Sequence, residues 1–485
     1  MRGGCSGNIT QRGMSGLVSK IISHFLSRFP LSGIDRGCLL VFSCQLETVS
    51  CTRWGTMKNW FGRSLVFGAV GLVAGLSAGT AARAEAIVIT GQQTSPVILD
   101  GGDSLEVRSG GSIEVVDVSG LNSSILIDGF IYVQNLWSIY LGIGSVLTGD
   151  LTVNGGIGPN PIDALPESGI AERGIQLDDA TIDGRFVNNG TINVRTNTLE
   201  MKQGSYIEGG FLNTGSMISQ AGGIRIKGTI NNGFINEGLI SSTPCPIDVS
   251  CANIKGIEIN DGGGINGDFV NSGRILSQNS AVDASRVTFN GSIINTGTVI
   301  SRQTTFKLSG SVTFDDNFNV IASFPTTING SFVNSGTIQG ISNMAVEFSR
   351  GIVTGDIVNE LGGIINADDQ AIRLDNSILN GSLINHGVLT SLGGNHALTI
   401  EGDRSRVDGY VINTGAISAA GAGKKGIRIT YGAASGITNI GTISGSLPNI
   451  GDRYDIEQQG SLGTLNNYND AAFAAFRLAG MKAPA

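Results

Sequence analysis

The chain contains one candidate for a nucleophilic serine. Ser104 stands in the string G-D-S-L at 102–105, and a serine hydroxyl can attack a carbonyl group when a neighbouring base takes its proton. The only histidines that could be that base are His24, His386 and His396, and none of them stands three positions after an aspartate in a D-x-x-H pattern. We therefore predict an ordinary turn between two strands at 102–105 and no catalytic residue.

Clustered carboxylates offer a second chemistry. Aspartate pairs occur at 178–179, 315–316 and 368–369, and two carboxyl groups can serve as acid and base on a glycosidic bond. The string R-I-K at 225–227 resembles the R-I-K of polygalacturonases, but the N-T-D and G-H-G strings that accompany it in those enzymes are absent. Asp-rich corners are also ordinary solvated turns, so polysaccharide cleavage is only the alternative function.

Metal binding finds no support in the sequence. His386 and His396 are ten residues apart, which matches no zinc-binding spacing. Cys245 and Cys251 stand in C-P-I-D-V-S-C and could close a small disulfide loop in an oxidising compartment, although free thiols are equally compatible with the pattern. The sequence predicts no cofactor.

A repeat dominates residues 171–445. Its unit is two apolar residues, then N-x-G, then one variable residue and usually Ile, Val or Leu. A variant, I-V-N-E-L-G-G-I-I, occupies 357–365. Most intervals between successive units are near 25 residues, and two longer intervals of 35 and 39 residues indicate insertions. The asparagines that we assign to the repeat turn are Asn188, Asn213, Asn236, Asn271, Asn295, Asn334, Asn385, Asn413 and Asn439.

The segments between these units predict the fold. Strings such as G-I-R-I at 223–226 and A-I-R-L at 371–374 alternate apolar and other residues, which is typical of a strand with one buried face. Three short strands in about 25 residues cannot bury that face alone, so stacked coils are expected. We predict a right-handed parallel β-helix of roughly 15 coils, about 70 Å long at the usual strand spacing.

The corners of the coil follow from the same unit. We expect Asn and Gly to support a turn with positive φ, and the stacked asparagines to form an amide ladder between coils. A β-sandwich array or a propeller is the alternative architecture, but propeller blades have longer repeats.

Charge is unevenly divided along the chain. Residues 1–84 hold nine of the 31 Lys and Arg residues and two of the 39 Asp and Glu residues, which leaves the remainder with a net charge of −15. An acidic body without a basic block excludes nucleic acid as a partner, since phosphate contacts need clustered cations.

The N-terminal part predicts export. Residues 57–84 have a basic start, an apolar run of 14 residues and the cleavage pattern A-R-A, which are the three parts of a signal peptide. We interpret 1–56 as a non-native or mis-assigned leader, with translation starting at Met57. Residues 85–170 are expected to form a cap with degenerate coils, and 446–485 a C-terminal cap and tail.

The repeat resembles the passenger domains of autotransporters, the type V secreted proteins of Gram-negative bacteria. The segment G-S-L-G-T-L-N-N-Y-N-D at 460–470 is similar to the stretch with which many such passengers approach their outer-membrane barrel. Only 18 residues follow Asn467, too few for a barrel of membrane-spanning strands. The barrel is therefore expected in a separate reading frame, or to have been lost.

The resemblance implies a function without catalysis. It suggests a stalk or adhesin-like binding surface for an unknown surface ligand or glycan. Such a chain would be displayed on the cell surface or secreted if a barrel is supplied, and would otherwise be periplasmic. The alternative from another class is a β-helix polysaccharide lyase or hydrolase.

Overall fold

The computed structural model describes residues 84–132, 137–158, 173–242, 254–260, 262–315, 320–421, 423–445, 456–468 and 476–478. The expected leader, the expected signal peptide except Ala84, and the pair Cys245 and Cys251 lie outside the described residues. Within the described ranges the chain forms strands and no α-helix, so no described helix is long and apolar enough to cross a membrane.

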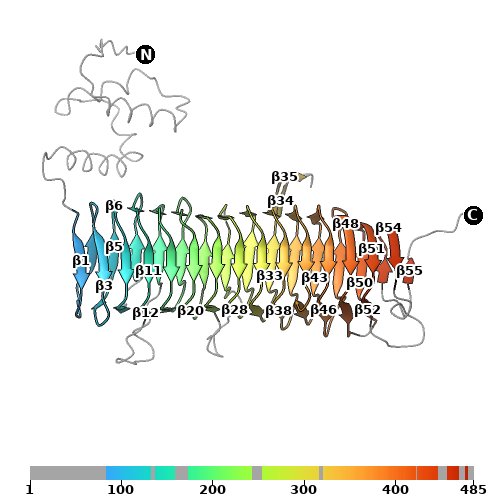
Figure 1. Cartoon of the computed structure of the whole chain (residues 1–485). Coiled ribbons are helices and arrows are strands. Elements are labelled where there is room, and N and C mark those ends of the chain that lie inside the picture. Colours follow the sequence, from blue (N-terminus) through green and yellow to red (C-terminus); the bar gives the residue numbers. More distant parts are fainter. Residues whose placement is uncertain are drawn as a thin grey trace, which may run out of the picture. The chain divides into compact units, whose positions relative to one another are not determined.

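One coil illustrates the repeat. It consists of β13 (Ile175–Leu177), β14 (Thr181–Ile182), β15 (Phe186–Asn188) and β16 (Thr191–Val194). Each strand pairs in parallel with the corresponding strand of the next coil, as β13 does with β17 (Leu199–Met201). The parallel β-helix predicted from the repeat is therefore confirmed (Figure 1).

The coil has four strands where three were expected. The fourth strand arises because a bend divides one expected strand into β14 and β15. The bend lies at the glycine just before the two apolar residues of the N-x-G unit. At Gly184 in this bend, an added Cβ would lie 2.5 Å from the carbonyl oxygen of Gly149 on the preceding coil. Close packing between coils thus interrupts the expected strand, and both halves remain in one sheet.

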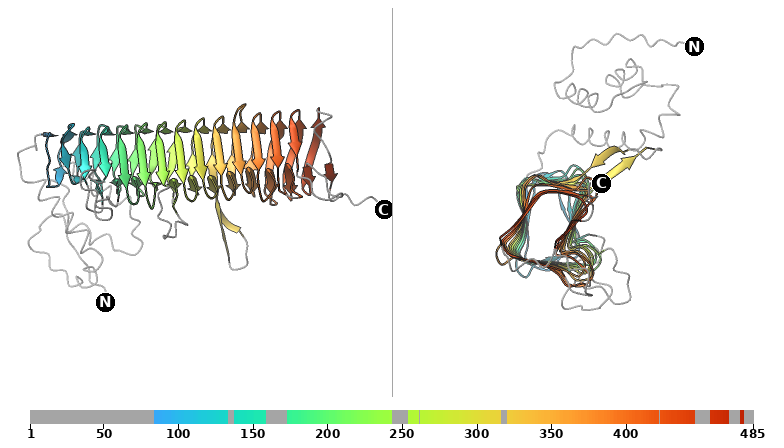
Figure 2. Two further views of the ribbon diagram at one scale, coloured as in Figure 1. Left: turned by 90° about the horizontal axis from the view of Figure 1, so that it is seen from below. Right: turned by 90° about the vertical axis from the view of Figure 1, so that its right-hand side faces the viewer.

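Three parallel sheets surround the core (Figure 2). Sheet A has 25 strands because most coils contribute two strands to it, and sheets B and C have 13 and 15 strands. The 15 strands of sheet C agree with the expected number of coils. They are β2 (Val97–Leu99), β5 (Val116–Val118), β9 (Ile139–Leu141), β13, β17, β21 (Ile224–Ile226), β25 (Ile257–Ile259), β29 (Val282–Ser285), β33 (Phe306–Ser309), β39 (Val346–Ser349), β43 (Ile372–Asp375), β47 (Leu398–Glu401), β50 (Ile427–Thr430), β53 (Ile456–Gln458) and β55 (Phe476–Leu478).

The terminal regions continue the same pairing. The first strand, β1 (Ala86–Ile89), pairs in parallel with β3 (Ser104–Val107), so the described part of 85–170 is built as coils. At the other end, β54 (Ser461–Asn467) pairs with β51 (Ala433–Asn439). The helical pairing therefore extends past residue 445.

The core is built by stacking like residues. Phe186, Phe211, Phe234 and Phe269 occupy the same position in four successive coils and are buried. Their ring centroids are separated by 5.0, 4.1 and 4.9 Å, with nearly parallel planes. Stacked rings at this spacing add aromatic attraction to the burial of apolar area.

The expected asparagine ladder is present beside this core. In each coil the amide Nδ2 of the repeat asparagine donates to the Oδ1 of the equivalent asparagine in the next coil, over 2.6–3.0 Å. The ladder runs from Asn188 to Asn467 and includes Asn359 of the variant unit. Buried amides are thereby kept hydrogen-bonded along the helix.

The expectation of positive φ at the N-x-G turn is wrong. No ladder asparagine and no glycine of an N-x-G unit is among the described residues with positive φ. The glycine is needed for another reason: a Cβ on Gly297 would lie 2.6 Å from the carbonyl oxygen of Ser272 and would also overlap the carbonyl oxygen of Gly273. Gly336, Gly415 and other N-x-G glycines meet the same obstacle.

Positive φ occurs instead at the corner between sheets C and A. Arg286, Arg350 and Asn376 each follow a sheet-C strand directly and have φ of 58°, 54° and 49°. Only a small part of backbone space with positive φ is open to residues other than glycine. At this corner, which we call the C–A corner, the chain therefore turns at a residue with a left-handed backbone conformation.

One hairpin departs from the coil pattern. Strands β34 (Ser311–Phe314) and β35 (Val320–Phe324) pair antiparallel and project from the side of the helix (Figures 1 and 2). They occupy the 39-residue interval between Asn295 and Asn334, where the spacing predicted an insertion.

Candidate functional site

The candidates for catalysis are dispersed in the structure. Ser104 begins β3, and the neighbouring Asp103 carboxylate accepts hydrogen bonds from the backbone N–H groups of Glu85 and Asp100, over 2.9 and 3.1 Å. Asp103 thus holds a turn between two strands, as expected, but the turn ends at Asp103, and Ser104 and Leu105 belong to β3. His386 is hydrogen-bonded through Nδ1 to the Thr414 hydroxyl over 2.7 Å, on the outside of the N-x-G corner.

His396 lies at the corner before sheet C and is 5% exposed. Its Nδ1 accepts a hydrogen bond from the backbone N–H of Lys425 over 2.9 Å. Burial, followed by the positive charges of Arg428, Lys424 and Lys425, lowers the pKa of His396 to about 3. The imidazole is therefore neutral near pH 7, and its basic nitrogen is already engaged in structure.

Charged side chains gather instead on the outer face of sheet C. Because side chains alternate along a strand, the middle residue of each apolar–x–apolar strand faces away from the core. The parallel register places these middle residues side by side. This charged row consists of Gln176, Glu200, Arg225, Glu258, Asp283, Lys307, Glu347, Arg373, Thr399, Arg428 and Glu457.

Ion pairs connect neighbouring coils along the charged row. Arg225 lies 3.7 Å from Glu200 and 3.3 Å from Glu258, and Lys255 lies 2.6 Å from Glu258 and 2.9 Å from Asp283. Burial lowers the pKa of Lys255, but its hydrogen bonds to the two carboxylates outweigh that effect, and the net pKa is raised. Cross-strand pairs of opposite charge stabilise neighbouring strands of a sheet.

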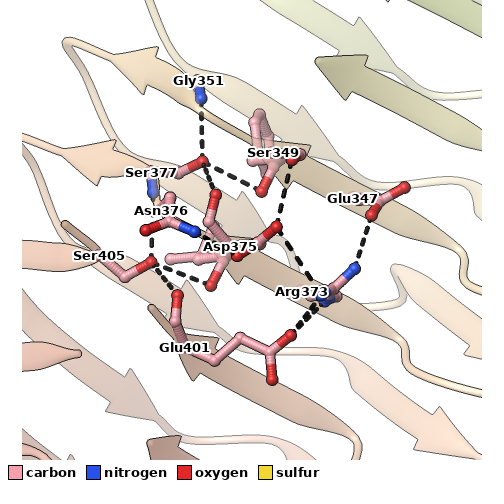
Figure 3. Close-up of polar contacts among 11 residues, drawn as sticks. Glu347, Ser349, Gly351, Arg373, Asp375, Asn376, Ser377, Glu401 and Ser405 are labelled. Carbon is pink, nitrogen blue, oxygen red and sulfur yellow. Dashed lines mark hydrogen bonds and ion pairs between the residues drawn. The ribbon is translucent and has the colours of Figure 1, made fainter. Parts of the chain in front are cut away.

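Arg373 is the centre of the densest cluster. Its guanidinium lies 2.8 Å from Glu347 on one side and 2.5 Å from Glu401 on the other, with Asp375 at 3.7 Å (Figure 3). The carboxylates come from β39, β43 and β47, which are adjacent strands. Burial raises the pKa of the Glu347 carboxyl in spite of the Arg373 charge.

Hydroxyl groups continue this cluster to the C–A corner. The Ser377 hydroxyl accepts the backbone N–H of Gly351 over 2.9 Å and donates to the carbonyl of Phe348 over 3.0 Å. The Ser405 hydroxyl likewise accepts the N–H of Ser377 over 3.2 Å (Figure 3). The polar backbone of the turn is satisfied by side chains of successive coils.

A shallow groove of about 800 Å³ lies at the N-terminal part of the charged face. Its lining includes Asp178, Glu200, Lys202, Arg225 and Lys227. The Lys202 ammonium lies 2.6 Å from the Asp178 carboxylate, so the carboxylates here are paired with cations. The groove brings together the R-I-K string and Asp178 of the first aspartate pair, a juxtaposition that the sequence left open.

Asp368 and Asp369 lie elsewhere, on the turn that leaves sheet B after β42 (Ile364–Ala367). Asp316, of the remaining pair, lies outside the described residues. Among the described residues, no group of three or more His, Cys, Asp or Glu side chains could hold a metal ion.

The charged row was not predicted from the sequence. Its signal was the middle residue of the alternating strings, which is Gln, Arg, Glu, Glu, Arg, Thr and Arg in the seven strings from 174–177 to 426–429. Only the apolar alternation of these strings predicts strands.

The chain matches no family model, no curated protein and no solved structure.

Proposed function

We propose that this chain is an exported β-helix of the cell envelope or surface, similar to an autotransporter passenger, which acts as a stalk with an adhesin-like binding face and without catalysis. The observation that carries the proposal is the charged row, because it runs along successive coils as a face on which acidic and basic side chains lie side by side. Repeated side chains on a solenoid face form the extended binding surfaces typical of such folds.

The electrostatics of the face favour binding over catalysis. An acid catalyst needs a proton-donating group near the operating pH and a free approach to substrate. Here Glu347 and Glu401 are held by Arg373, and Asp178 by Lys202. Ion-paired groups of this kind fix the geometry of a surface on which polar ligands can dock.

Export is tested on the full chain produced in a Gram-negative host. The proposal predicts that protein recovered from the periplasm begins at Glu85, the first residue after the A-R-A pattern, as measured by N-terminal sequencing. A chain that stays in the cytoplasm with residues 57–84 attached would contradict the proposal.

The alternative function, a polysaccharide lyase or hydrolase, is favoured by one observation. The shallow groove places Asp178 and Glu200 beside Arg225 and Lys227, and carboxylates with nearby cations are what acidic polysaccharide cleavage requires. Incubation with polygalacturonate distinguishes the two functions. We expect no new reducing ends and no unsaturated product, whereas turnover that is lost in Glu200→Gln but kept in Glu237→Gln would establish the enzyme.

A further inference from the structure

The hairpin of β34 and β35 forms a second cavity at its base, separate from the groove on the charged face. The cavity has a volume of about 280 Å³, close to the lower end of the usual range for small-ligand pockets. Val312, Ser323 and Pro325 of the hairpin and its base form one wall. The opposite wall belongs to the coils that follow the insertion.

Three residues of the C–A corner line that opposite wall. Arg350, Asn376 and Arg404 come from successive coils, and each stands two residues before a sheet-A position that is paired with the next coil. In the third coil the corner is two residues longer, because Gly402 and not Arg404 directly follows the sheet-C strand. Adjacent strands are about 4.8 Å apart, so the two arginines are separated by about 10 Å along the helix axis, with the amide between them.

The two guanidinium groups are available to a ligand. Arg350 and Arg404 are exposed, and neither side chain forms an ion pair or hydrogen bond with the described part of the chain. This contrasts with Arg373, which is surrounded by carboxylates on the neighbouring face. None of the described residues that line the cavity is acidic.

The floor between the arginines is apolar. Ile352 and Ile378 lie side by side on adjacent strands of sheet A and line the cavity together with Val312 and Pro325. Such surfaces pack against the apolar faces of a ring, and the polar groups at the margin fix its orientation. The cavity therefore combines two separated positive charges with apolar walls.

We propose that this pocket binds an acidic oligosaccharide, with one ring carboxylate at Arg350 and a second at Arg404. Guanidinium groups pair with carboxylates through two parallel hydrogen bonds. Two arginines whose backbones are about 10 Å apart along the axis suit an extended ligand with a carboxylate on separate rings. The inference rests on the proposed binding role and names the class of ligand.

The test is a calorimetric titration of the full chain with a trimer of galacturonic acid, and with an uncharged glucose trimer as the ligand control. Arg350→Asn is the principal variant, because asparagine tolerates the left-handed backbone of this position. Arg404→Gln is the second. Arg286→Asn is the control for binding at the other site, since Arg286 has the same corner conformation but lines the groove on the charged face and not this cavity.

We expect the acidic trimer to bind and the uncharged trimer not to bind. Arg350→Asn and Arg404→Gln should each weaken binding roughly ten-fold or more, because each removes a charge-assisted hydrogen bond. Arg286→Asn should leave affinity unchanged, and Arg350→Asn and Arg404→Gln should keep the unfolding temperature of the parent chain. Inorganic sulfate at equal ionic strength should not displace the trimer.

Absence of binding by the acidic trimer would overturn the pocket, as would an equal loss of affinity in Arg286→Asn or complete displacement by sulfate. The proposed function fails by different results: cleavage of the trimer would contradict a non-catalytic role even if binding depends on Arg350. Retention of the chain in the cytoplasm would contradict export and leave the titration unaffected.

Discussion

The N-x-G corner and the C–A corner turn the same chain by different means. At the N-x-G corner, glycine is required because the backbone of the preceding coil occupies the space of a side chain, as at Gly297. At the C–A corner the requirement is a left-handed backbone, which Arg286, Arg350, Asn376 and Tyr431 all satisfy. One corner depends on contact between coils, the other on local conformation.

This difference explains where variation is tolerated. A position that contacts the backbone of neighbouring coils admits one residue type, and so it repeats visibly in the sequence. A corner that requires only a backbone conformation admits Arg, Asn and Tyr. The inserted hairpin, Arg350 and Arg404 accordingly lie at the C–A corner, away from the asparagine ladder.

The largest expected effect is at the N-x-G corner. Gly297→Ala should lower the free energy of unfolding by about 3 kcal/mol, because the added methyl group overlaps backbone that cannot move without shifting a coil. Urea titration measures the loss. Gly91→Ala is the control, since a Cβ there meets nothing within 4 Å. Equal, small losses in both variants would show that the coils are not in close contact at this corner.

The asparagine ladder should be next in sensitivity. Asn334→Ala leaves the buried Nδ2 of Asn295 and the Oδ1 of Asn359 without their ladder partners and should cost about 2 kcal/mol. Asn290→Ala is the matched change in an exposed ladder, where Asn290 bonds to Asn266 and Asn329 but water can replace the lost partners. A cost at Asn290 as large as that at Asn334 would contradict the role of burial.

The corner before sheet C should respond to pH. Because the pKa of His396 is about 3 in the folded chain and about 6.5 in an unfolded one, only the unfolded chain takes up the proton as pH falls below 6.5. The stability present above that pH is lost progressively toward pH 3.

From near pH 7 to near pH 5.5, His396→Gln should therefore lose about 1 kcal/mol less stability than the parent chain. Urea titrations at the two pH values measure this difference. His386→Gln, at a half-buried histidine on the N-x-G corner, serves as the control and should follow the parent. Identical pH dependence of the parent and His396→Gln would refute this assignment.

The smallest loss of stability is expected at a C–A corner glycine that has a left-handed backbone but no close contact with another coil. Gly144, after the sheet-C strand β9, has φ of 75° and open space around its missing side chain. Gly144→Ala should cost only about 1 kcal/mol, which is the penalty of a left-handed alanine, and Gly144→Asn should cost less. Unfolding in urea checks both, and a larger loss than in Gly297→Ala would reverse the comparison of the two corners.

The repeat was sufficient to predict the fold and the ladder. Units spaced by about 25 residues required stacked coils, and Asn at the same place in each coil required stacked amides. The reason for the glycine was not predictable, because Gly190 or Gly297 looks the same in sequence whether it serves positive φ or close contact. Only the distance to the preceding coil decides between them.

The pocket was predictable in part. Arg350, Asn376 and Arg404 each stand nine residues before a ladder asparagine, so their alignment was present in the spacing. The wall formed by the hairpin was not predictable. An insertion interrupts the repeat, so the spacing of the repeat does not show which residues of the insertion face the coils. That Val312 and Pro325 return to face these arginines depends on the antiparallel pairing of β34 and β35.

Hydrogen exchange of the full chain, with and without the galacturonic acid trimer, tests most directly whether binding belongs to the C–A corner and scaffolding to the N-x-G corner. We predict that the trimer slows exchange in the peptides that contain Ser323, Arg350 and Arg404, and leaves exchange at the N-x-G turns around Gly297 and Gly336 unchanged. Protection centred on the N-x-G turns, or no change in the peptides of the C–A corner, would contradict this division of the molecule.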